Sequence, residues 1–441
     1  MKFYRTFNLL LVGLGLLLSA YNVTANPASG HATSSHGKTS SATQLSSHAQ
    51  AQSPNLNQST SPTAFFDAKG RLWTTWIFGQ FLYVNYSDDS GATFSKPVKV
   101  NVQAEKISSN PEARPNIVVA NNGNVYVSYA QNLKKRFSGN VRFSRSVDGG
   151  NSFSAPITVN DNLELIGHSF PVLTVNAEGT LYMAWLDSRD KVAHKRANAG
   201  DKDFIGSSVY YAVSQDEGRS FQANAVLQQH SCQCCRISVA LDQQQHPVYL
   251  WRHIFDNSIR DHALVRFTTE TELSSIMRAS NDRWAVNACP HHGPSISIDN
   301  QDDYHMVWFT QGDARKGSFY AFSETSGEGF SEPVGLGEDP QSAQHPHVLA
   351  FNKDVYIVWK SFDGVKTTLF GMKSEDRGRS WGEAYTIAET QNGSDHGFLI
   401  HNGQYMFVSW HTADQGYRLL KADPVKSDKF VSFASLPSQA Q

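Results

Sequence analysis

The feature that most restricts the fold of this chain is a short loop motif that recurs along it. The motif reads Ser-x-Asp-x-Gly-x-x-Phe or Trp, and its aspartates are Asp89, Asp148, Asp216 and Asp376. A weaker copy begins at Ser323, where Thr325 takes the place of the aspartate. The aspartate of such a motif accepts backbone N–H bonds within a tight turn, and the glycine supplies a positive φ. The repeat therefore predicts a turn that stabilises the fold and has little catalytic content.

A regular unit of strands surrounds the motif. The second strand of each unit is the clearest, because β-branched and aromatic residues follow a turn made by Gly, Asn, Asp or Gln. These second strands are expected at 72–78, 125–130, 181–186, 248–251, 305–309, 355–360 and 405–410. Successive units start roughly 50 to 65 residues apart, which is the spacing of a four-stranded propeller blade. The sequence predicts an all-β propeller of four-stranded blades, with seven blades favoured and six as the alternative.

One unit inside the run of copies lacks the motif. Ser214 and Ser323 are separated by about twice the repeat, so a unit without a copy lies between them. The third strand of that unit, 263–269, continues into Glu270-Thr271-Glu272 without a glycine turn. The same unit begins with Cys232-Gln233-Cys234-Cys235-Arg236. The unit that departs from the repeat thus also carries three of the four cysteines of the chain.

The repeated motif resembles the Asp-box of the sialidase superfamily of β-propellers, from about residue 61 to the C-terminus. The resemblance implies that the four aspartates are structural and lie at the outer rim. Sialidases also share an arginine triad that binds a carboxylate, a tyrosine nucleophile activated by a glutamate, and an aspartate acid/base. The Arg-Ile-Pro motif expected early in that fold is missing, and Arg114-Pro115 is its nearest equivalent. Arg236 is the only other arginine at the start of a blade, so Arg114 and Arg236 are candidate ligand-binding residues and no catalytic residue is assigned.

The N-terminus predicts an exported protein. Lys2 and Arg5 precede the short apolar run 9–18, as in a secretory signal. We expect a signal peptide at 1–25, a disordered Ser-, His- and Gln-rich linker at 26–60 and the propeller at 61–441. The mature protein is expected to be periplasmic or secreted, without a stable membrane span. A formal net charge of −2 argues against nucleic acid as a partner.

Histidine and cysteine recur where the blades begin. In a propeller the first strand of each blade lines the axis, so the residues just before it surround one mouth of the central channel. Five consecutive blades begin with such donors. The candidates are His168, Cys232, Cys234, Cys235, Cys289, His291, His292, His345, His347 and His396. Closing the ring is expected to gather them into one pocket on the axis.

These donors suggest a metal site. Thiolate and imidazole ligands favour copper(I) or zinc, and we prefer copper, with zinc as the second choice. An extended strand would place Cys235 on the face opposite to Cys232 and Cys234, so one ion can take all three only where the segment turns or bulges. The expected imidazole partners are His291, His292 and His168, with His345, His347 and His396 as second choices.

Disulfides are the alternative for the cysteines, because an exported protein meets an oxidising compartment. Four cysteines allow three connectivities. A bond from Cys289 to one of the other three would join adjacent blades. Disulfides do not account for the histidines that surround the cysteines.

Three classes of function remain open. The leading hypothesis is metal binding at the channel mouth, for copper handling or sensing or for a metal-dependent reaction. The alternative is an exo-sialidase-like glycoside hydrolase or a glycan-binding module, with a glycan or another small molecule as its ligand. The third class is a protein-interaction scaffold with an empty polar channel. The sequence leaves open whether the protein is an enzyme.

Overall fold

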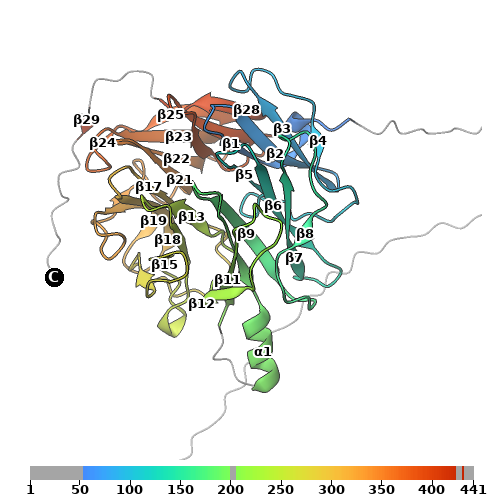
Figure 1. Cartoon of the computed structure of the whole chain (residues 1–441). Coiled ribbons are helices and arrows are strands. Elements are labelled where there is room, and N and C mark those ends of the chain that lie inside the picture. The colour runs from blue at the N-terminus through green and yellow to red at the C-terminus, as the bar shows by residue number, and fades with distance from the viewer. Residues whose placement is uncertain (1–52, 199–204, 424–429, 432–441) are drawn as a thin grey trace, which may run out of the picture. The chain divides into compact units, whose positions relative to one another are not determined.

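The chain forms a ring of seven antiparallel β-sheets, which the computed structural model describes for residues 53–198, 205–423 and 430–431 (Figure 1). Six of these blades have four strands, and the seventh has three. The first strands of neighbouring blades contact one another around the ring, and the last blade contacts the first. This arrangement confirms the prediction of an all-β propeller with seven blades.

The strands of each blade follow one another in chain order. Blade one contains β1 (Thr60–Phe66), β2 (Leu72–Phe78), β3 (Phe81–Ser87) and β4 (Val98–Lys99). Blade two contains β5 (Asn116–Val119), β6 (Val125–Asn132), β7 (Gly139–Ser146) and β8 (Ile157–Thr158). Blade three contains β9 (His168–Val175), β10 (Leu181–Asp187), β11 (Ser207–Ser214) and β12 (Ala225–Ser231). Blade four contains β13 (Ser238–Leu241), β14 (Pro247–Arg252), β15 (His262–Arg266) and β16 (Met277–Arg278).

The last three blades continue the order. Blade five contains β17 (Ser295–Ile298), β18 (Tyr304–Gln311), β19 (Lys316–Ser323) and β20 (Val334–Gly335). Blade six contains β21 (Gln344–Phe351), β22 (Asp354–Phe362), β23 (Thr367–Ser374) and β25 (Tyr385–Thr390). Blade seven contains β26 (Phe398–His401), β27 (Met406–Thr412) and β28 (Gly416–Lys421). Outside the blades, β24 (Trp381–Gly382) pairs with β29 (Phe430–Val431), and the helices are η1 (Leu56–Gln58), α1 (Arg189–Ala197) and η2 (Asp256–Ser258).

Tryptophans of the second strands pack the blades together. The side chains of Trp185 and Trp308 are at most 1% exposed. Trp185 of blade three shares a buried cluster with Val141 of blade two, and Trp308 of blade five shares one with Leu264 of blade four. A buried aromatic ring of this size contributes more contact area than any other side chain. The second strands therefore form the apolar joints between neighbouring blades.

The Asp-boxes are closed by hydrogen bonds within each loop. In blade three, Ser214 Oγ donates to Asp216 Oδ1 at 2.8 Å and accepts the Gly218 N–H at 3.0 Å. Asp216 Oδ1 also accepts the Ser220 N–H at 3.0 Å. These bonds show that the aspartate stabilises the turn, as the motif predicts. The same bonds recur at Asp89, Asp148 and Asp376.

The aromatic ring that ends each box packs against the blade before its own. The ring of Phe221 in blade three lies 5.0 Å from that of Phe143 in blade two. Phe94 in blade one lies 6.0 Å from Tyr417 in blade seven, so the same contact also closes the ring. The structure shows that each box is a contact between two blades.

The first described residues belong to the propeller, although the composition suggests a disordered linker over 26–60. Leu56 in η1 is 8% exposed and packs in the core shared by blades one and seven. Asn57 Oδ1 accepts the Tyr417 N–H at 3.2 Å, which attaches this segment to β28. The signal peptide predicted at 1–25 lies outside the described residues.

One helix interrupts the all-β pattern. α1 follows β10, and Asp190 in its first turn accepts hydrogen bonds from Ser208 Oγ at 2.6 Å and from the Tyr210 hydroxyl at 2.9 Å. Within the described part of the chain, no helix is long and apolar enough to cross a membrane.

Candidate functional site

Three of the four cysteines meet in a turn between blades three and four. Cys232 follows β12, and its N–H donates to the Arg252 carbonyl at 3.0 Å. The next residues turn and do not continue the strand, so the Sγ atoms of Cys234 and Cys235 lie 3.9 Å and 3.6 Å from Cys232 Sγ. A regular strand would have pointed Cys235 to the opposite face. The turn therefore brings the three buried thiols together.

The fourth cysteine joins from the loop between blades four and five. Cys234 Sγ, Cys289 Sγ and a ring nitrogen of His291 all lie within 4.8 Å of one another. All four cysteines are free thiols, and Cys289 and His291 are exposed. His291 has a φ of 53°, which turns the chain at this point. We call Cys232, Cys234, Cys235, Cys289 and His291 the thiol cluster.

Positive side chains lie at the buried end of the thiol cluster. Arg260 Nη1 donates to Cys232 Sγ at 3.2 Å. Hydrogen bonds from the thiols of Cys234 and Cys235, followed by the positive charges of Arg252 and Arg260, lower the pKa of Cys232 well below its usual value. The same hydrogen bonds raise the pKa of Cys234 and of Cys235. The sulfur of Cys232 is thus surrounded by two neighbouring thiols and a guanidinium group.

A buried carboxylate lies on the axial side of the same loops. Glu112 accepts hydrogen bonds from Arg236 Nη1 at 2.8 Å, from the Gly293 N–H at 3.0 Å and from His345 Nδ1 at 3.0 Å. Burial acts to raise the pKa of Glu112, but the charge of Arg236 and the hydrogen bond from His345 outweigh it, and the pKa is about 2. Glu112 is therefore an anion at neutral pH although its side chain is only 5% exposed.

Three histidines stack beside Glu112. The ring centroids of His292 and His345 are 4.1 Å apart, and those of His345 and His396 are 3.5 Å apart. His292 also stacks on Phe309 at 4.1 Å. Burial lowers the pKa of His292 to about 3, and it also lowers the pKa of His345 and of His396. This histidine stack is therefore uncharged at neutral pH.

The histidine stack is less suited to hold an ion than the thiol cluster. Glu112, His345 and His396 do offer donor atoms within 4.8 Å of one another. The rings of the two histidines are only 17° from parallel, however. The lone pair of an imidazole nitrogen lies in the plane of its ring, so stacked rings point side by side and not at a common ion. One ring would have to turn before both could bind the same metal.

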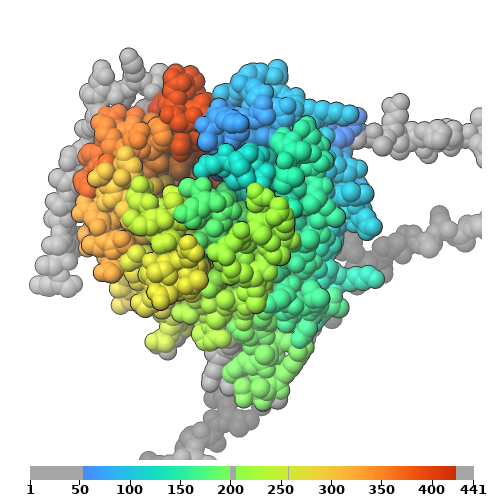
Figure 2. All heavy atoms as spheres, in the orientation of Figure 1, coloured from blue at the N-terminus to red at the C-terminus, as the bar shows by residue number. Residues whose placement is uncertain are grey.

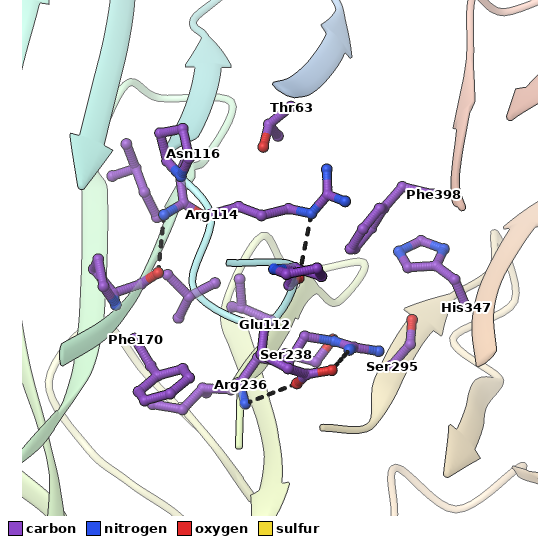
Figure 3. A pocket seen from close by; sticks show the side chains of 17 residues that line it. Thr63, Glu112, Arg114, Asn116, Phe170, Arg236, Ser238, Ser295, His347 and Phe398 are labelled. Carbon is purple, nitrogen blue, oxygen red and sulfur yellow. Dashed lines mark hydrogen bonds and ion pairs between the residues drawn. The ribbon is translucent and has the colours of Figure 1, made fainter. Parts of the chain in front are cut away.

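A cavity of about 240 Å³ opens on the axis beside these groups (Figure 3). Arg114 and Arg236 both point toward Phe398, with their guanidinium carbons 4.3 Å and 5.8 Å from its ring centroid. Arg114 forms an ion pair with Asp395, and Arg236 forms one with Glu112. On the face seen in Figure 2, the surface is hollowed between the teal and the orange-red segments. Other lining residues are Thr63, Asn116, Phe170, Ser238, Ser295 and His347.

Two of the predicted ligands lie outside both the thiol cluster and the histidine stack. His168 is buried in blade three, with Nδ1 2.8 Å from the Gly139 carbonyl oxygen and Nε2 3.6 Å from Asp187 Oδ2. His347 lines the axial cavity, and its Nδ1 accepts the Leu399 N–H at 3.3 Å. We expected one axial pocket to hold all the donors. The structure instead distributes them over the thiol cluster, the histidine stack and these two positions.

Two segments, 232–236 and 289–293, explain this division. Each begins with residues of the thiol cluster and ends with a group that binds Glu112, namely Arg236 and Gly293. A Cβ atom on Gly293 would overlap the Arg236 side chain, so the two segments are in direct contact. Closing the ring brings the starts of the blades together. Within each segment, however, the residues of the thiol cluster and the group that binds Glu112 lie at opposite ends. The thiol cluster and the axial cavity are therefore neighbours that share two loops.

Glu112, Asp395 and Arg260 were not among the site residues predicted from the sequence. A signal for the first two existed, because each is an acidic residue at the start of a blade that also carries Arg114 or His396. An acidic and a basic residue at such a place predict an ion pair across the axis. Arg260 does not lie at the start of a blade. It reaches Cys232 from the loop that connects β14 and β15.

The chain is similar to several solved structures in its fold. No protein-family model and no curated protein matches the chain. An ulvan lyase of the polysaccharide lyase family PL25 aligns with a TM-score of 0.54 and 12% identity, over 83% of this chain and 95% of that chain. A protein of unknown function from Dyadobacter fermentans aligns with a TM-score of 0.49 and 13% identity, over 74% of this chain and 97% of that chain. A Hadza microbial sialidase aligns with a TM-score of 0.47 and 12% identity, over 80% of this chain and 76% of that chain.

At 12% identity, the likeness to the ulvan lyase shows a shared propeller fold. The repeated motif predicted a fold like that of the Asp-box propellers, and this likeness confirms that fold.

Proposed function

We propose that the protein binds copper(I) through the thiol cluster. The observation that carries the proposal is the meeting of all four cysteines with His291, although they come from loops that precede two different blades. Such a set of soft sulfur donors with one imidazole is the ligand type that copper(I) prefers, and zinc is the second choice.

The sulfur positions support this proposal. Two sulfurs bound to one ion at about 2.3 Å are about 3.8 Å apart in tetrahedral geometry and about 4.0 Å apart in trigonal geometry. The distances from Cys232 Sγ to the Sγ atoms of Cys234 and Cys235 are 3.9 Å and 3.6 Å. An ion can therefore enter with small movements of the side chains. Arg260 beside Cys232 offsets part of the negative charge of the thiolates.

The proposal also fits the predicted export of the protein. In an oxidising compartment, crowded cysteines end in disulfides unless a metal ion holds them. We therefore propose that copper(I) loading keeps the four thiols reduced in the periplasm or outside the cell. Copper handling or sensing is the role that such a site would serve.

Metal analysis tests this function. The full chain is purified without oxygen and offered copper(I), and it is expected to retain copper after desalting. A Cys232→Ser, Cys235→Ser double variant has lost two sulfur ligands and is expected to retain less copper. His401→Ala, which changes a histidine of β26 in blade seven, serves as the matched control and keeps the wild-type copper content. A wild-type protein that retains no copper with its thiols reduced would refute the proposal.

The axial cavity supports a second candidate, the binding of an acidic saccharide. Arg114, Arg236 and the ring of Phe398 line it together, and guanidinium groups and aromatic rings are suited to sugar carboxylates and sugar faces. An ulvan lyase of the same fold has been solved bound to -[GlcA(1-4)Rha3S]-. Calorimetric titration with glucuronate-containing oligosaccharides is expected to give binding that Arg236→Lys weakens. No heat with the wild-type protein would rule this candidate out.

A further inference from the structure

We infer that the thiol cluster holds two copper(I) ions that share the Cys234 thiolate. The inner ion is bound by Cys232, Cys234 and Cys235, and the outer ion by Cys234, Cys289 and His291. This inference rests on the proposed copper function and adds the number of ions, their separate ligands and the order in which they exchange.

The positions of the donor atoms separate the cluster into two sets. The donor atoms of Cys232, Cys234 and Cys235 lie within 4.8 Å of one another, and so do those of Cys234, Cys289 and His291. The five donors do not form one set within that distance. Two sulfurs on the same ion can be at most about 4.6 Å apart, which is twice a bond of about 2.3 Å. A single ion therefore cannot bind all five donors, whereas two ions can.

Cys234 is the only residue that belongs to both sets. A thiolate has more than one lone pair, so its sulfur can bridge two soft ions. With Cys234 as the bridge, each ion has three ligands, and no donor of the cluster is left over. The arrangement uses every cysteine of the chain.

The charges around the cluster also favour two ions. Two copper(I) ions remove half of the negative charge of four thiolates, whereas one ion removes a quarter. Arg260 lies at the inner set, with Nη1 3.2 Å from Cys232 Sγ. This guanidinium group can balance part of the charge that remains.

The two sets differ in their access to solvent. Cys232, Cys234 and Cys235 are 1%, 6% and 2% exposed, so protein surrounds the inner ion. Cys289 and His291 are both exposed. A competing thiol or chelator in solution can therefore reach the outer ion directly. The outer ion is the one that the protein exchanges with a copper(I) donor or acceptor, and the inner ion stays in place.

Copper stoichiometry in the intact chain tests the inference. Native mass spectrometry of the full chain, loaded with copper(I) without oxygen, is expected to give two ions per chain. His291→Ala and Cys289→Ser each remove outer ligands and are expected to keep one ion. Cys232→Ser is expected to keep the other, and Cys234→Ser, which removes the bridge, is expected to weaken both. Because His291 is exposed, His291→Ala leaves the fold intact, which circular dichroism checks.

Chelator competition gives a second measurement. Bathocuproine disulfonate is expected to remove copper from the wild-type protein in two phases of equal size, and the fast phase is expected to be absent in His291→Ala. One ion per chain in the wild type, weakened alike by every variant, would overturn the two-ion inference and leave the copper function standing. A wild-type chain that binds no copper would instead refute the proposed function itself.

Discussion

Glu112 connects four blades at the channel mouth. Its carboxylate joins the start of blade two to Arg236 before blade four, to Gly293 before blade five and to His345 in the first strand of blade six. Removing one partner of a buried ion pair leaves the other charge buried and unpaired, which typically costs about 3 to 5 kcal/mol. The Glu112 side chain thus holds four blades together at the channel mouth.

Replacing Glu112 is therefore expected to destabilise the protein strongly. Glu112→Gln should lower the free energy of unfolding by about 3 kcal/mol or more, because the charge of Arg236 then has no partner. Denaturant unfolding measures the change. Glu389→Gln is the matched control, because Glu389 pairs with Lys366 at the surface, where such a pair contributes about 0 to 1 kcal/mol. Equal effects of the two variants would contradict the role assigned to Glu112.

The pKa of Glu112 also predicts a pH dependence. The folded protein lowers this pKa from 4.5 to about 2. The stabilisation that results is fully present above pH 4.5, and it is lost as the pH falls through about 2. The difference in unfolding free energy between the wild type and Glu112→Gln should therefore shrink over this range. A difference that is independent of pH would show that Glu112 is not ionised in the folded protein.

For single residues, the residue type predicts which side chains can donate to a metal ion, but it does not predict which of these side chains lie together. The cysteines and His291 come together as the spacing of the blade starts suggests. His168 shares the same place in the repeat and yet lies against Gly139 of blade two and Asp187 of its own blade. The turn at Cys234 and the positive φ of His291 decide the difference, and neither follows from strand periodicity.

At the scale of the element, the Asp-box is a contact between two blades. Its glycine has a positive φ and also lies against the preceding blade. In blade two, a Cβ atom on Gly150 would lie 2.5 Å from the ring of Trp73 in blade one, whereas a Cβ atom on Gly149 would meet nothing within 4 Å. Both glycines have a positive φ, so they differ only in what surrounds them.

These two glycines allow a matched comparison. Gly149→Ala should cost about 1 kcal/mol because of the backbone conformation alone. Gly150→Ala should cost about 1 to 3 kcal/mol more, because the methyl group forces Trp73 to move. Thermal and denaturant unfolding measure both variants. If Gly149→Ala costs as much as Gly150→Ala, the box does not act through the contact between the blades.

The strands themselves were predictable from the sequence, because each second strand follows a turn and carries an apolar run. The packing of the box aromatics was not. Whether Phe221 contacts its own blade or the one before depends on the angle between blades, which the closure of the ring sets. A local motif carries no information about that angle.

At the scale of the molecule, blade four differs from the blades on either side of it. It has no Asp-box, and Phe267 at the end of its third strand fills the contact with blade three by packing on Tyr182 and Tyr211 at 5.5 Å and 5.2 Å. The thiol cluster takes its residues from 232–235, which enter this blade, and from 289–291, which leave it. A bound ion would therefore connect the two ends of blade four.

Copper(I) is expected to stabilise blade four more than the rest of the ring. A ligand that binds only the folded state adds about 4 kcal/mol when its free concentration is about 1,000 times its Kd. Hydrogen exchange of the copper-loaded protein should slow mainly in residues 228–293, and removal of copper with a chelator should reverse the change. Slowing that is uniform over all seven blades would show that the ion does not act on this region.

The missing Asp-box has a consequence for the lifetime of the protein. Its neighbours are held by turns that the chain always carries, whereas under the proposed copper function blade four depends on an ion that the surroundings supply. A region that opens more often is cut more often by proteases, in proportion to the population of the open form. Scarcity of copper would then shorten the survival of the molecule, and the first cuts would fall in a single blade.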